Sequence, residues 1–462
     1  MQNILLNKEE LFEAVSKKDV KTIRLIFEEH NPVDIADALS KIERVSDFIF
    51  IFKTVPALFT AEVFSYLENK TKEKIINEIS NQQISDILEN LYTDDIVDFI
   101  EEMPSNLIQK ILQSATKNTR DDINHLLDYP DNSTGSIMTL EYVELKAKDN
   151  ALKAMEKVRI QGKDAETISY LFVVNDKREL VGTLHLRDLI FADPKSLVNE
   201  IMEKDFISVF TYDDQEVAAN IVKKYDLNTI PVTTKDFRLV GIITADDIID
   251  VIEQEASEDM QKMGAMTPLV DPYLQTSVFN LAKKRIPWLF ILMVSATITS
   301  LIINKYEVIL QTIPALSMFI PMLMDTSGNA GNQSSVLVIR GLALGEINTK
   351  DYLKILRKEF MVALIAGSVL AVSEFIWIIV QIKIGLISID VGISIYQVAA
   401  LIGVTLTIIV MLGKTIGAAL PLIAKKLKID PALMAGPLIT TIVDGLALIA
   451  YFFLATQIFM LL

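Results

Sequence analysis

The strongest constraint on this chain is the distribution of its apolar residues. From Leu281 onward the sequence is mostly apolar, whereas the first ~275 residues are rich in charge. A helix needs about 20 apolar residues to cross the ~30 Å hydrocarbon layer of a bilayer. We expect five transmembrane helices, at roughly 286–304, 310–338, 360–385, 394–422 and 432–460. The fourth contains Gly413, Lys414 and Pro421, so its end should be broken or extend beyond the lipid.

The charge divides along the same line. Residues 1–275 carry 30 Lys and Arg against 51 Asp and Glu, a net −21, whereas residues 276–462 carry 14 against 9, a net +5. Nucleic acids attract basic surfaces, so no nucleic-acid partner is expected. Flanking basic residues number 12 on one side of the expected helices and 2 on the other. The positive-inside rule then places the N-terminus in the cytoplasm and the C-terminus outside, in a multi-pass protein of the cell (inner or plasma) membrane.

The sequence lacks residues that several classes of function require. The chain has no cysteine, which excludes disulfides, thiolate zinc sites and cysteine nucleophiles. It has only three histidines and no nucleotide-hydrolysis loop, so we expect neither an enzyme nor ATP-driven transport. The first residues contain no charged segment followed by an apolar one, so no signal peptide is expected.

The first ~130 residues predict short helices only. Apolar residues recur three or four positions apart, as at Leu11 and Val15 and again at Ile23 and Ile26, which is the spacing of one helix face. Asn31 before Pro32 predicts a capped helix start. Repeated short helices favour a small superhelical stack.

Asp94 and Asp98 stand four residues apart in one of these helices and therefore share a face. One interpretation is a solvated helix start, because the helix dipole favours acidic residues there. The other is a share in a cation site.

Residues 134–255 alternate β-rich runs with helical stretches, which indicates α/β units. They contain an internal repeat, because 137–138 recurs as 201–202 and 180–190 recurs as 239–249. We expect each longer phrase to form a strand, a tight Gly turn, a second strand and a capped helix. Two such halves resemble a tandem CBS pair, a regulatory module.

In CBS modules that bind adenine nucleotides, a Thr or Ser and an Asp of this phrase hold the ribose. The second repeat has Thr244 and Asp247 at these positions, whereas the first has His185 and Asp188. The alternatives are therefore ATP bound at Thr244 and Asp247, or a structural dimerisation module.

Residues 245–270 form the densest acidic run, which we expect to be a helix continuing through Met266. Carboxylates one turn apart on a helix repel each other. This applies to the pair Asp246 and Asp250 and to the pair Glu255 and Asp259. A chain keeps such pairs where a cation sits between them, and oxygen ligands favour Mg²⁺ or Ca²⁺. The alternative is a solvated linker helix.

A polar stretch, 321–333, interrupts the second apolar segment. Polar groups without partners cost several kcal/mol each in hydrocarbon, and ionisable residues at membrane depth indicate a functional site. Asp444 is a second such place, with Thr440 and Pro437 on the same helix face. We predict that these two segments line one aqueous pore for a hard divalent cation. Asp430 is expected to cap the fifth helix and to gather cations at the mouth.

One aspartate per chain is too little for a cation site, so a two-fold homodimer is expected to supply a pair. Mg²⁺ sheds its water reluctantly. A ring of carboxylates, amides and hydroxyls could therefore select the hydrated ion through outer-sphere hydrogen bonds.

Six positions of the polar stretch closely resemble the P-x-x-x-D-x-x-G-N-x-G-x-Q signature of the MgtE magnesium channel family: Pro321, Asp325, Gly328, Asn329, Gly331 and Gln333. The resemblance covers nearly the whole chain. It implies an all-α superhelical acidic N domain at 1–130, an α/β tandem CBS domain at 131–250, an acidic connecting (plug) helix at 251–280 and an all-α pore domain of five helices at 281–462.

The resemblance also implies site residues and a function. Asp444 would be the selectivity aspartate, with Asn329 and Asp325 nearby. Regulatory Mg²⁺ would bind acidic cytoplasmic residues: Asp94, Asp98, Asp226, Asp247, Asp250, Glu255, Glu258 and Asp259. We expect passive Mg²⁺ uptake that cytosolic Mg²⁺ shuts off. The alternatives are a cation-coupled exchanger, a transporter of another divalent ion such as Co²⁺, and a membrane-anchored nucleotide sensor that does not transport.

Overall fold

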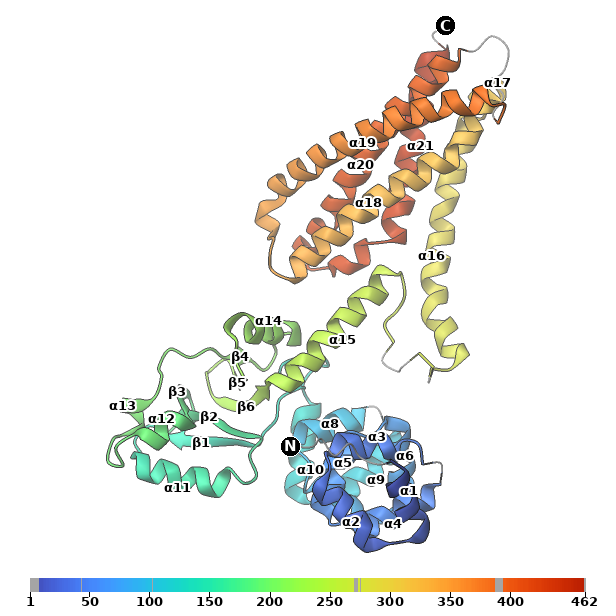
Figure 1. Cartoon of the computed structure of the whole chain (residues 1–462). Coiled ribbons are helices and arrows are strands. Elements are labelled where there is room, and N and C mark those ends of the chain that lie inside the picture. Colours follow the sequence, from blue (N-terminus) through green and yellow to red (C-terminus); the bar gives the residue numbers. More distant parts are fainter. Residues whose placement is uncertain are drawn as a thin grey trace. The chain divides into compact units, whose positions relative to one another are not determined.

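The computed structural model describes residues 8–42, 44–101, 103–269, 273–274, 276–386 and 394–460. The chain divides into two compact units, Met1–Ile252 and Glu253–Leu462 (Figure 1). The first seven residues of the expected N domain, and residues 270–272 and 275 of the expected plug segment, lie outside this description.

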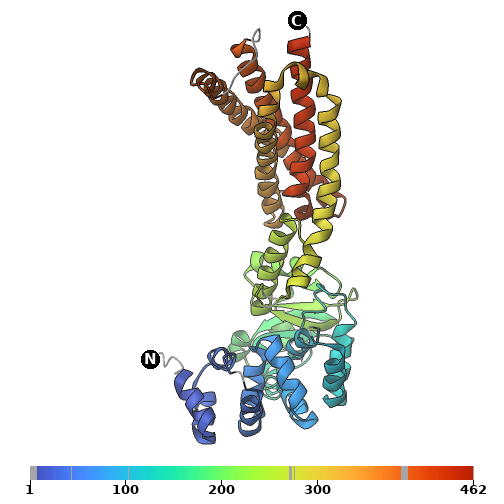
Figure 2. The same cartoon turned by 90° about the vertical axis from the view of Figure 1, so that its right-hand side faces the viewer.

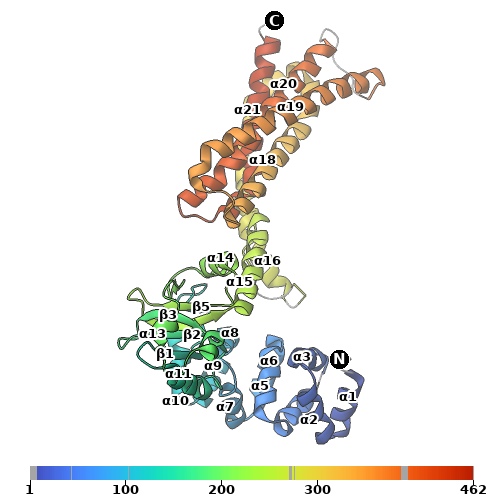
Figure 3. The ribbon, with the colours of Figure 1, turned by 60° about the vertical axis from the view of Figure 1, so that its left-hand side comes forward.

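The first unit begins with short helices only. Ten lie in its described N-terminal part: α1 (Lys8–Lys17), α2 (Val20–Glu29), α3 (Pro32–Leu39), α4 (Val45–Thr54), α5 (Ala57–Ser65), α6 (Asn69–Glu78), α7 (Asn81–Leu88), α8 (Thr93–Glu101), α9 (Ser105–Ser114) and α10 (Lys117–Leu127). They stack in chain order (Figure 3). The Asn31 side chain accepts a hydrogen bond from the Val33 backbone at 3.0 Å, which confirms the predicted cap.

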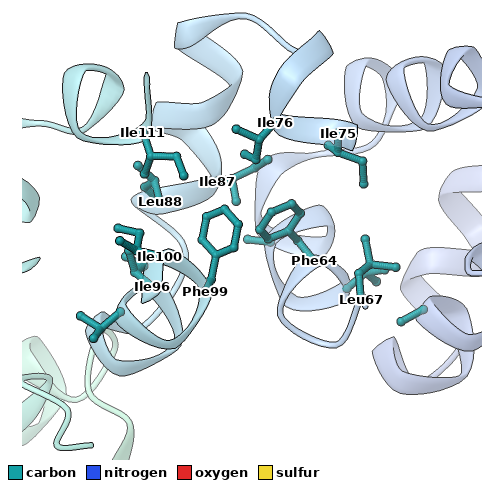
Figure 4. Packing of buried hydrophobic residues seen from close by; sticks show 14 of the residues in the cluster. Phe64, Leu67, Ile75, Ile76, Ile87, Leu88, Ile96, Phe99, Ile100 and Ile111 are labelled. Atoms are coloured by element: carbon teal, nitrogen blue, oxygen red, sulfur yellow. The ribbon is translucent and has the colours of Figure 1, made fainter. Parts of the chain in front are cut away.

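Apolar side chains from successive helices meet in the interior of this stack. The rings of Phe64 and Phe99 pack edge to face at a centroid distance of 5.2 Å, between Ile76, Ile87 and Ile100 (Figure 4). The predicted apolar positions Leu11, Val15 and Ile23 are buried in the same core. The all-helical prediction is confirmed.

The rest of this unit is a repeated α/β arrangement. Its elements are β1 (Tyr142–Lys146), α11 (Ala151–Gln161), β2 (Thr167–Val174), β3 (Leu180–His185), α12 (Leu186–Phe191), α13 (Val198–Ile201), β4 (Val209–Phe210), α14 (Gln215–Tyr225), β5 (Thr229–Thr233) and β6 (Leu239–Thr244). They form two sheets, β1-β2-β3 and β4-β5-β6, each with one parallel and one antiparallel pair. The predicted repeat is therefore a structural repeat.

The predicted Gly turn within each phrase is wrong. Gly182 lies inside β3 and Gly241 inside β6, so each phrase forms one strand followed by a helix. The glycines are needed for a close approach instead. A Cβ on Gly182 would lie 2.7 Å from the Glu203 carbonyl oxygen, and one on Gly241 would lie 2.8 Å from that of Thr139. Each half thus packs its strand against the segment that precedes the other half.

The helix α15 (Ala245–Met263) crosses the boundary between the units. It ends three residues before Met266, where our prediction placed it. Ala265 adopts a left-handed conformation with φ of 52°, and the Met266 backbone N–H bonds back to the Gln261 carbonyl. This geometry closes a helix and cannot continue it.

The second unit is built from long helices. Its further elements are α16 (Val278–Lys305), α17 (Glu307–Thr312), η1 (Pro314–Phe319), α18 (Ile320–Ala343), η2 (Thr349–Asp351), α19 (Tyr352–Lys383), α20 (Ile395–Lys426), η3 (Pro431–Met434) and α21 (Pro437–Met460). The helices α18 to α21 form one bundle, and α16 contacts it along α21 (Figure 2).

Within the described residues, four segments are long and apolar enough to cross a membrane: Val278–Lys305, Thr349–Lys383, Ile395–Lys426 and Pro431–Phe459. The second expected helix is α18, whose polar stretch keeps it out of this set. The expected start at 310 is wrong, because α17 and η1 precede α18. The helix α20 is continuous through Gly413, Lys414 and Pro421, so it is not broken there.

Glycines bring α18 and α20 into backbone contact. A Cβ on Gly413 would lie 2.6 Å from the Ser327 carbonyl oxygen, and one on Gly331 would lie 3.2 Å from the Gly413 carbonyl oxygen. Small residues of this kind let membrane helices approach closely.

We expect Gly413→Ala to destabilise the membrane unit by about 1–3 kcal/mol, because the added methyl group meets backbone that must shift. Thermal unfolding of the purified protein in detergent measures the effect. Gly445→Ala on α21 is the matched control, since its Cβ would meet only the Ile302 side chain at 3.5 Å. Equal unfolding temperatures for the two variants would contradict the account.

Candidate functional site

The predicted pore residue Asp444 faces α18. Its Oδ1 accepts a hydrogen bond from the Ser327 hydroxyl at 3.4 Å, and the neighbouring Gly328 leaves room for Thr440. The Thr440 hydroxyl itself donates to the Pro437 carbonyl at 2.9 Å. Asp444 is half-buried, and its charge repels that of Asp325. The two predicted pore segments are therefore adjacent, on α18 and α21.

A polar face runs along α18. It consists of Asp325, Asn329 and Gln333, which are spaced four residues apart and are all exposed in the described chain. By contrast, Asn332 points inward, and its Oδ1 accepts a hydrogen bond from the Gly436 backbone N–H at 3.1 Å. Our sequence analysis did not single out Ser327 or Asn332, because their roles depend on which helix lies opposite.

Asp430 caps the start of the last membrane segment, Pro431–Phe459, which confirms the predicted cap, although the first turn of this segment is η3 and not α21. Its Oδ1 accepts from the Ala432 backbone N–H at 2.8 Å and so caps η3, which precedes α21. Its Oδ2 accepts from the Lys262 ammonium at 2.6 Å, and Lys262 also pairs with Glu258 one turn back on α15. These two carboxylates raise the pKa of Lys262 against its partial burial. Asp430 and Glu258, both predicted as cation ligands, thus pair with the same ammonium group, that of Lys262.

The first unit contains an acidic cluster between its helical part and its α/β part. Its members come from α8, from the first repeat and from the start of α15: Asp94, Asp95, Asp98, Glu141, Glu166, Asp246 and Asp247. Glu141 joins the two parts, because it accepts hydrogen bonds from the Thr93 backbone N–H at 3.3 Å and from the Thr93 hydroxyl.

Burial and mutual repulsion shift the carboxyl groups of the cluster. Asp94 is 8% exposed, and its burial, with the nearby charge of Asp247, raises its pKa well above the usual range. Asp98 is exposed at the surface, but loss of hydration to the surrounding protein, with the charges of Glu101 and Asp247, raises its pKa to about 7. Desolvation and neighbouring acids raise the pKa of Glu166 to about 8 and that of Asp247 to about 6. Of the two interpretations that the sequence left open, the solvated helix start is therefore wrong for Asp94.

One of the two candidate nucleotide residues, Asp247, belongs to this cluster. The Thr244 hydroxyl donates to Asp247 Oδ2 at 2.7 Å, so the two are held together. In the first repeat His185 packs against the Tyr170 ring at a centroid distance of 4.1 Å. Asp247 is thus the one residue shared by the predicted nucleotide and regulatory sets.

The other predicted regulatory residues are spread more widely. Asp226 ends α14 in a left-handed conformation, while Asp250, Glu255, Glu258 and Asp259 lie along α15. Within the described residues, no three acidic or histidine side chains converge tightly enough to hold a metal ion. Glu141 and Glu166 were missed, because they are adjacent to β1 and β2 and carry no local pattern.

Three family models match the chain. One described as a divalent cation transporter, MgtE, matches residues 320–454, the MgtE intracellular N domain matches 30–132, and the CBS domain matches 135–195 and 198–254.

Named relatives match over most of their length. The magnesium transporter MgtE of Thermus thermophilus is 32% identical over 96% of both chains, and that of Bacillus subtilis is 33% identical over 91% of this chain and 94% of its own. A crystal structure of the cytosolic domain of the Mg²⁺ channel MgtE in complex with ATP is 32% identical. It has a TM-score of 0.50 and covers 53% of this chain and 99% of its own.

The raised pKa values predict how stability depends on pH. Asp98, Asp247 and Glu166 retain protons in the folded state at pH values where the unfolded chain has lost them, so stability is lost as pH rises through about 6 to 8. In Mg²⁺-free buffer, the Tm of the full chain should fall between about pH 5 and pH 8. Added Mg²⁺ should raise it more at the higher pH.

Asp98→Asn should flatten this dependence, since it removes one of the titrating groups. Glu28→Gln, an exposed carboxylate of α2, serves as the control and should leave the slope unchanged. A Tm that rises over this pH interval would contradict the account.

Proposed function

The chain belongs to the MgtE family of magnesium transporters, and from that premise we propose that it is a Mg²⁺-selective channel for passive uptake. The proposal rests first on Asp444, a carboxylate at membrane depth on α21. It accepts a hydrogen bond from Ser327 of α18, and a second acid of α18, Asp325, lies close enough for the two charges to repel each other. Such residues within a membrane indicate an ion pathway. As a multi-pass membrane protein, the chain would pass the ion between its own helices or between two copies.

We propose the second arrangement, a homodimer. The polar face of α18 is uncovered in a single chain, and hydrocarbon cannot hydrogen-bond to it. In addition, α16 has no buried residue. A second copy related by a two-fold axis would cover a polar face with its own equivalent and bring two Asp444 carboxylates to one pore.

Such a pore could select Mg²⁺ without dehydrating it. The oxygens of Asp444, Asp325 and Asn329 would accept hydrogen bonds from the water shell, which Mg²⁺ sheds reluctantly. An inside-negative potential of 100 mV contributes ~2.3 kcal/mol per charge and hence ~4.6 kcal/mol for a divalent ion. This electrical driving force suffices for Mg²⁺ uptake without ATP. In the proposed orientation the N-terminus lies on the cytoplasmic side, which the ion enters.

We further propose that cytosolic Mg²⁺ closes the channel. The acidic cluster supports this, because its carboxyl groups repel one another and a divalent cation would relieve the repulsion. Glu258 and Asp259 of α15 would take part as ligands, with Asp226, Asp250 and Glu255 contributing charge. Binding to the closed state alone would shift the population toward it.

ATP is proposed as a second ligand. A relative's cytosolic domain has been solved in complex with ATP, and Thr244 and Asp247 match the ribose-binding positions of CBS modules. Because Asp247 also belongs to the acidic cluster, nucleotide and Mg²⁺ would act on the same carboxylate.

We expect Asp444→Ala to reduce Mg²⁺ flux into proteoliposomes to the level of protein-free liposomes, since the pore loses both symmetry-related charges. Fluorescence of an internal Mg²⁺ indicator measures the flux. Glu346→Ala, an exposed acid between α18 and η2, should conduct like the wild type. Unchanged flux in Asp444→Ala would refute the pore assignment, and flux that needs a Na⁺ or H⁺ gradient would favour an exchanger.

Neutralising Glu258 and Asp259 together, by Glu258→Gln and Asp259→Asn, should leave the channel conducting at Mg²⁺ concentrations that close the wild type. Flux is measured with Mg²⁺ varied on the cytoplasmic side. The control neutralises the exposed pair Glu9 and Glu10 of α1, which changes the net charge equally. Normal closure of the α15 double variant would refute its role in gating.

A further inference from the structure

A polar layer crosses the second unit between three helices. It consists of Ser334 of α18, Glu359 of α19 and Lys414 of α20. One helical turn to one side lies an apolar cluster of Ala330, Ala363 and Val410. One turn to the other side lies a second apolar cluster that includes Val338, Ile355 and Ala418. The three polar residues are therefore in register and flanked by two apolar layers; Ser334 and Lys414 are buried there, and Glu359 is half-buried.

Lys414 is the unusual member of this layer. It is 7% exposed, and among the ion pairs of the described residues none involves its ammonium. As the sequence analysis expected, it lies inside the fourth long apolar helix, α20. A charged group in such surroundings is costly, and in membrane proteins it marks a functional role.

The Lys414 ammonium donates a hydrogen bond to Gln333 Oε1 at 3.2 Å. On the other side of the layer, the Ser334 hydroxyl donates to Glu359 Oε2 at 2.5 Å. Two consecutive residues of α18 are thus held by α20 and α19, which fixes the rotation of α18 about its axis. The polar face of α18 depends on that rotation.

The bond to Lys414 also decides what Gln333 presents. An ammonium only donates hydrogen bonds, so the amide must turn its oxygen toward Lys414 and its NH₂ group away. Gln333 is exposed at the end of the face that carries Asp325 and Asn329. A hydrated cation points its water hydrogens outward and needs acceptors, which an NH₂ group cannot supply. The acceptor-rich part of this face therefore ends at Gln333.

We propose that Lys414 is a positioning residue that limits how tightly the pore holds Mg²⁺. It acts through Gln333, whose oxygen it withdraws from the pore, and through its own charge beside the end of the polar face. Conduction requires binding weak enough for the ion to leave. In the proposed orientation this end is cytoplasmic, so Lys414 favours release into the cell. The inference rests on the proposed channel function.

The test measures Mg²⁺ flux through the full-length protein in liposomes as a function of external Mg²⁺, which separates the half-saturating concentration from the maximal rate. Lys414→Met should lower the half-saturating concentration about tenfold, the scale expected for one nearby charge acting on a divalent ion in a partly wet environment. The maximal rate should fall with it. Lys414→Arg keeps the charge and the donors and should resemble the wild type.

A second variant isolates the amide. Lys414→Met frees the Gln333 side-chain oxygen to face the pore, and Gln333→Leu removes that oxygen. In the double variant, the half-saturating concentration should therefore return part of the way toward the wild-type value. Where Lys414→Met fails to fold, Lys414→Gln replaces it, because it removes the charge but retains a donor, and the same direction of shift is expected.

The outcomes are distinguishable. A Lys414→Met or Lys414→Gln protein with a lower maximal rate but an unchanged half-saturating concentration would overturn the inference, since that is the result of a purely structural role. Failure of Lys414→Arg to resemble the wild type would overturn it as well. Absence of Mg²⁺ flux in the wild type would instead refute the channel proposal, and the inference with it.

Discussion

The membrane unit depends on one constraint: polar side chains of α18 must find partners on neighbouring helices, because hydrocarbon offers none. Glycines of α18 and α20 permit the close approach that this pairing needs. Among the described residues, five side chains of α18 are paired in this way: Ser327 with Asp444, Asn332 with the Gly436 backbone, Gln333 with Lys414, Ser334 with Glu359, and Ser335 with the Met434 backbone. These contacts hold α18 in one rotation, and that rotation leaves Asp325 and Asn329 uncovered.

The first unit presents the opposite situation, because its acidic groups are brought together with few partners. Asp94 of α8 and Asp247 of α15 are close enough to raise each other's cost of ionisation. Glu141 bridges the two parts through Thr93, so the arrangement persists despite the repulsion. Protons and divalent cations would both relieve it. The proposed response to Mg²⁺ thus follows from the same electrostatics that makes stability depend on pH.

The sequence predicted elements well where the signal is local. The helical N-terminal part, the repeat and the capped start at Asn31 follow from periodicity and capping, and the structure confirms them. The errors occur where a distant segment decides the outcome. Gly182 and Gly241 resembled turn residues, yet they serve a close strand contact with the other repeat. Lys414 lies in the expected fourth helix, but only the structure shows that it is buried and bonded to Gln333 of α18.

The sequence alone determined which residues can carry the chemistry, because apolar length, carboxylate spacing and the polar stretch of α18 depend on composition and order only. Tertiary structure decided which of them meet. Asp430 is paired with Lys262, 168 residues away in sequence, and Ser327 lies 117 residues from Asp444. Glu166 enters the acidic cluster without any local pattern. Such contacts arise from packing between remote segments, and packing has no periodic trace in the chain.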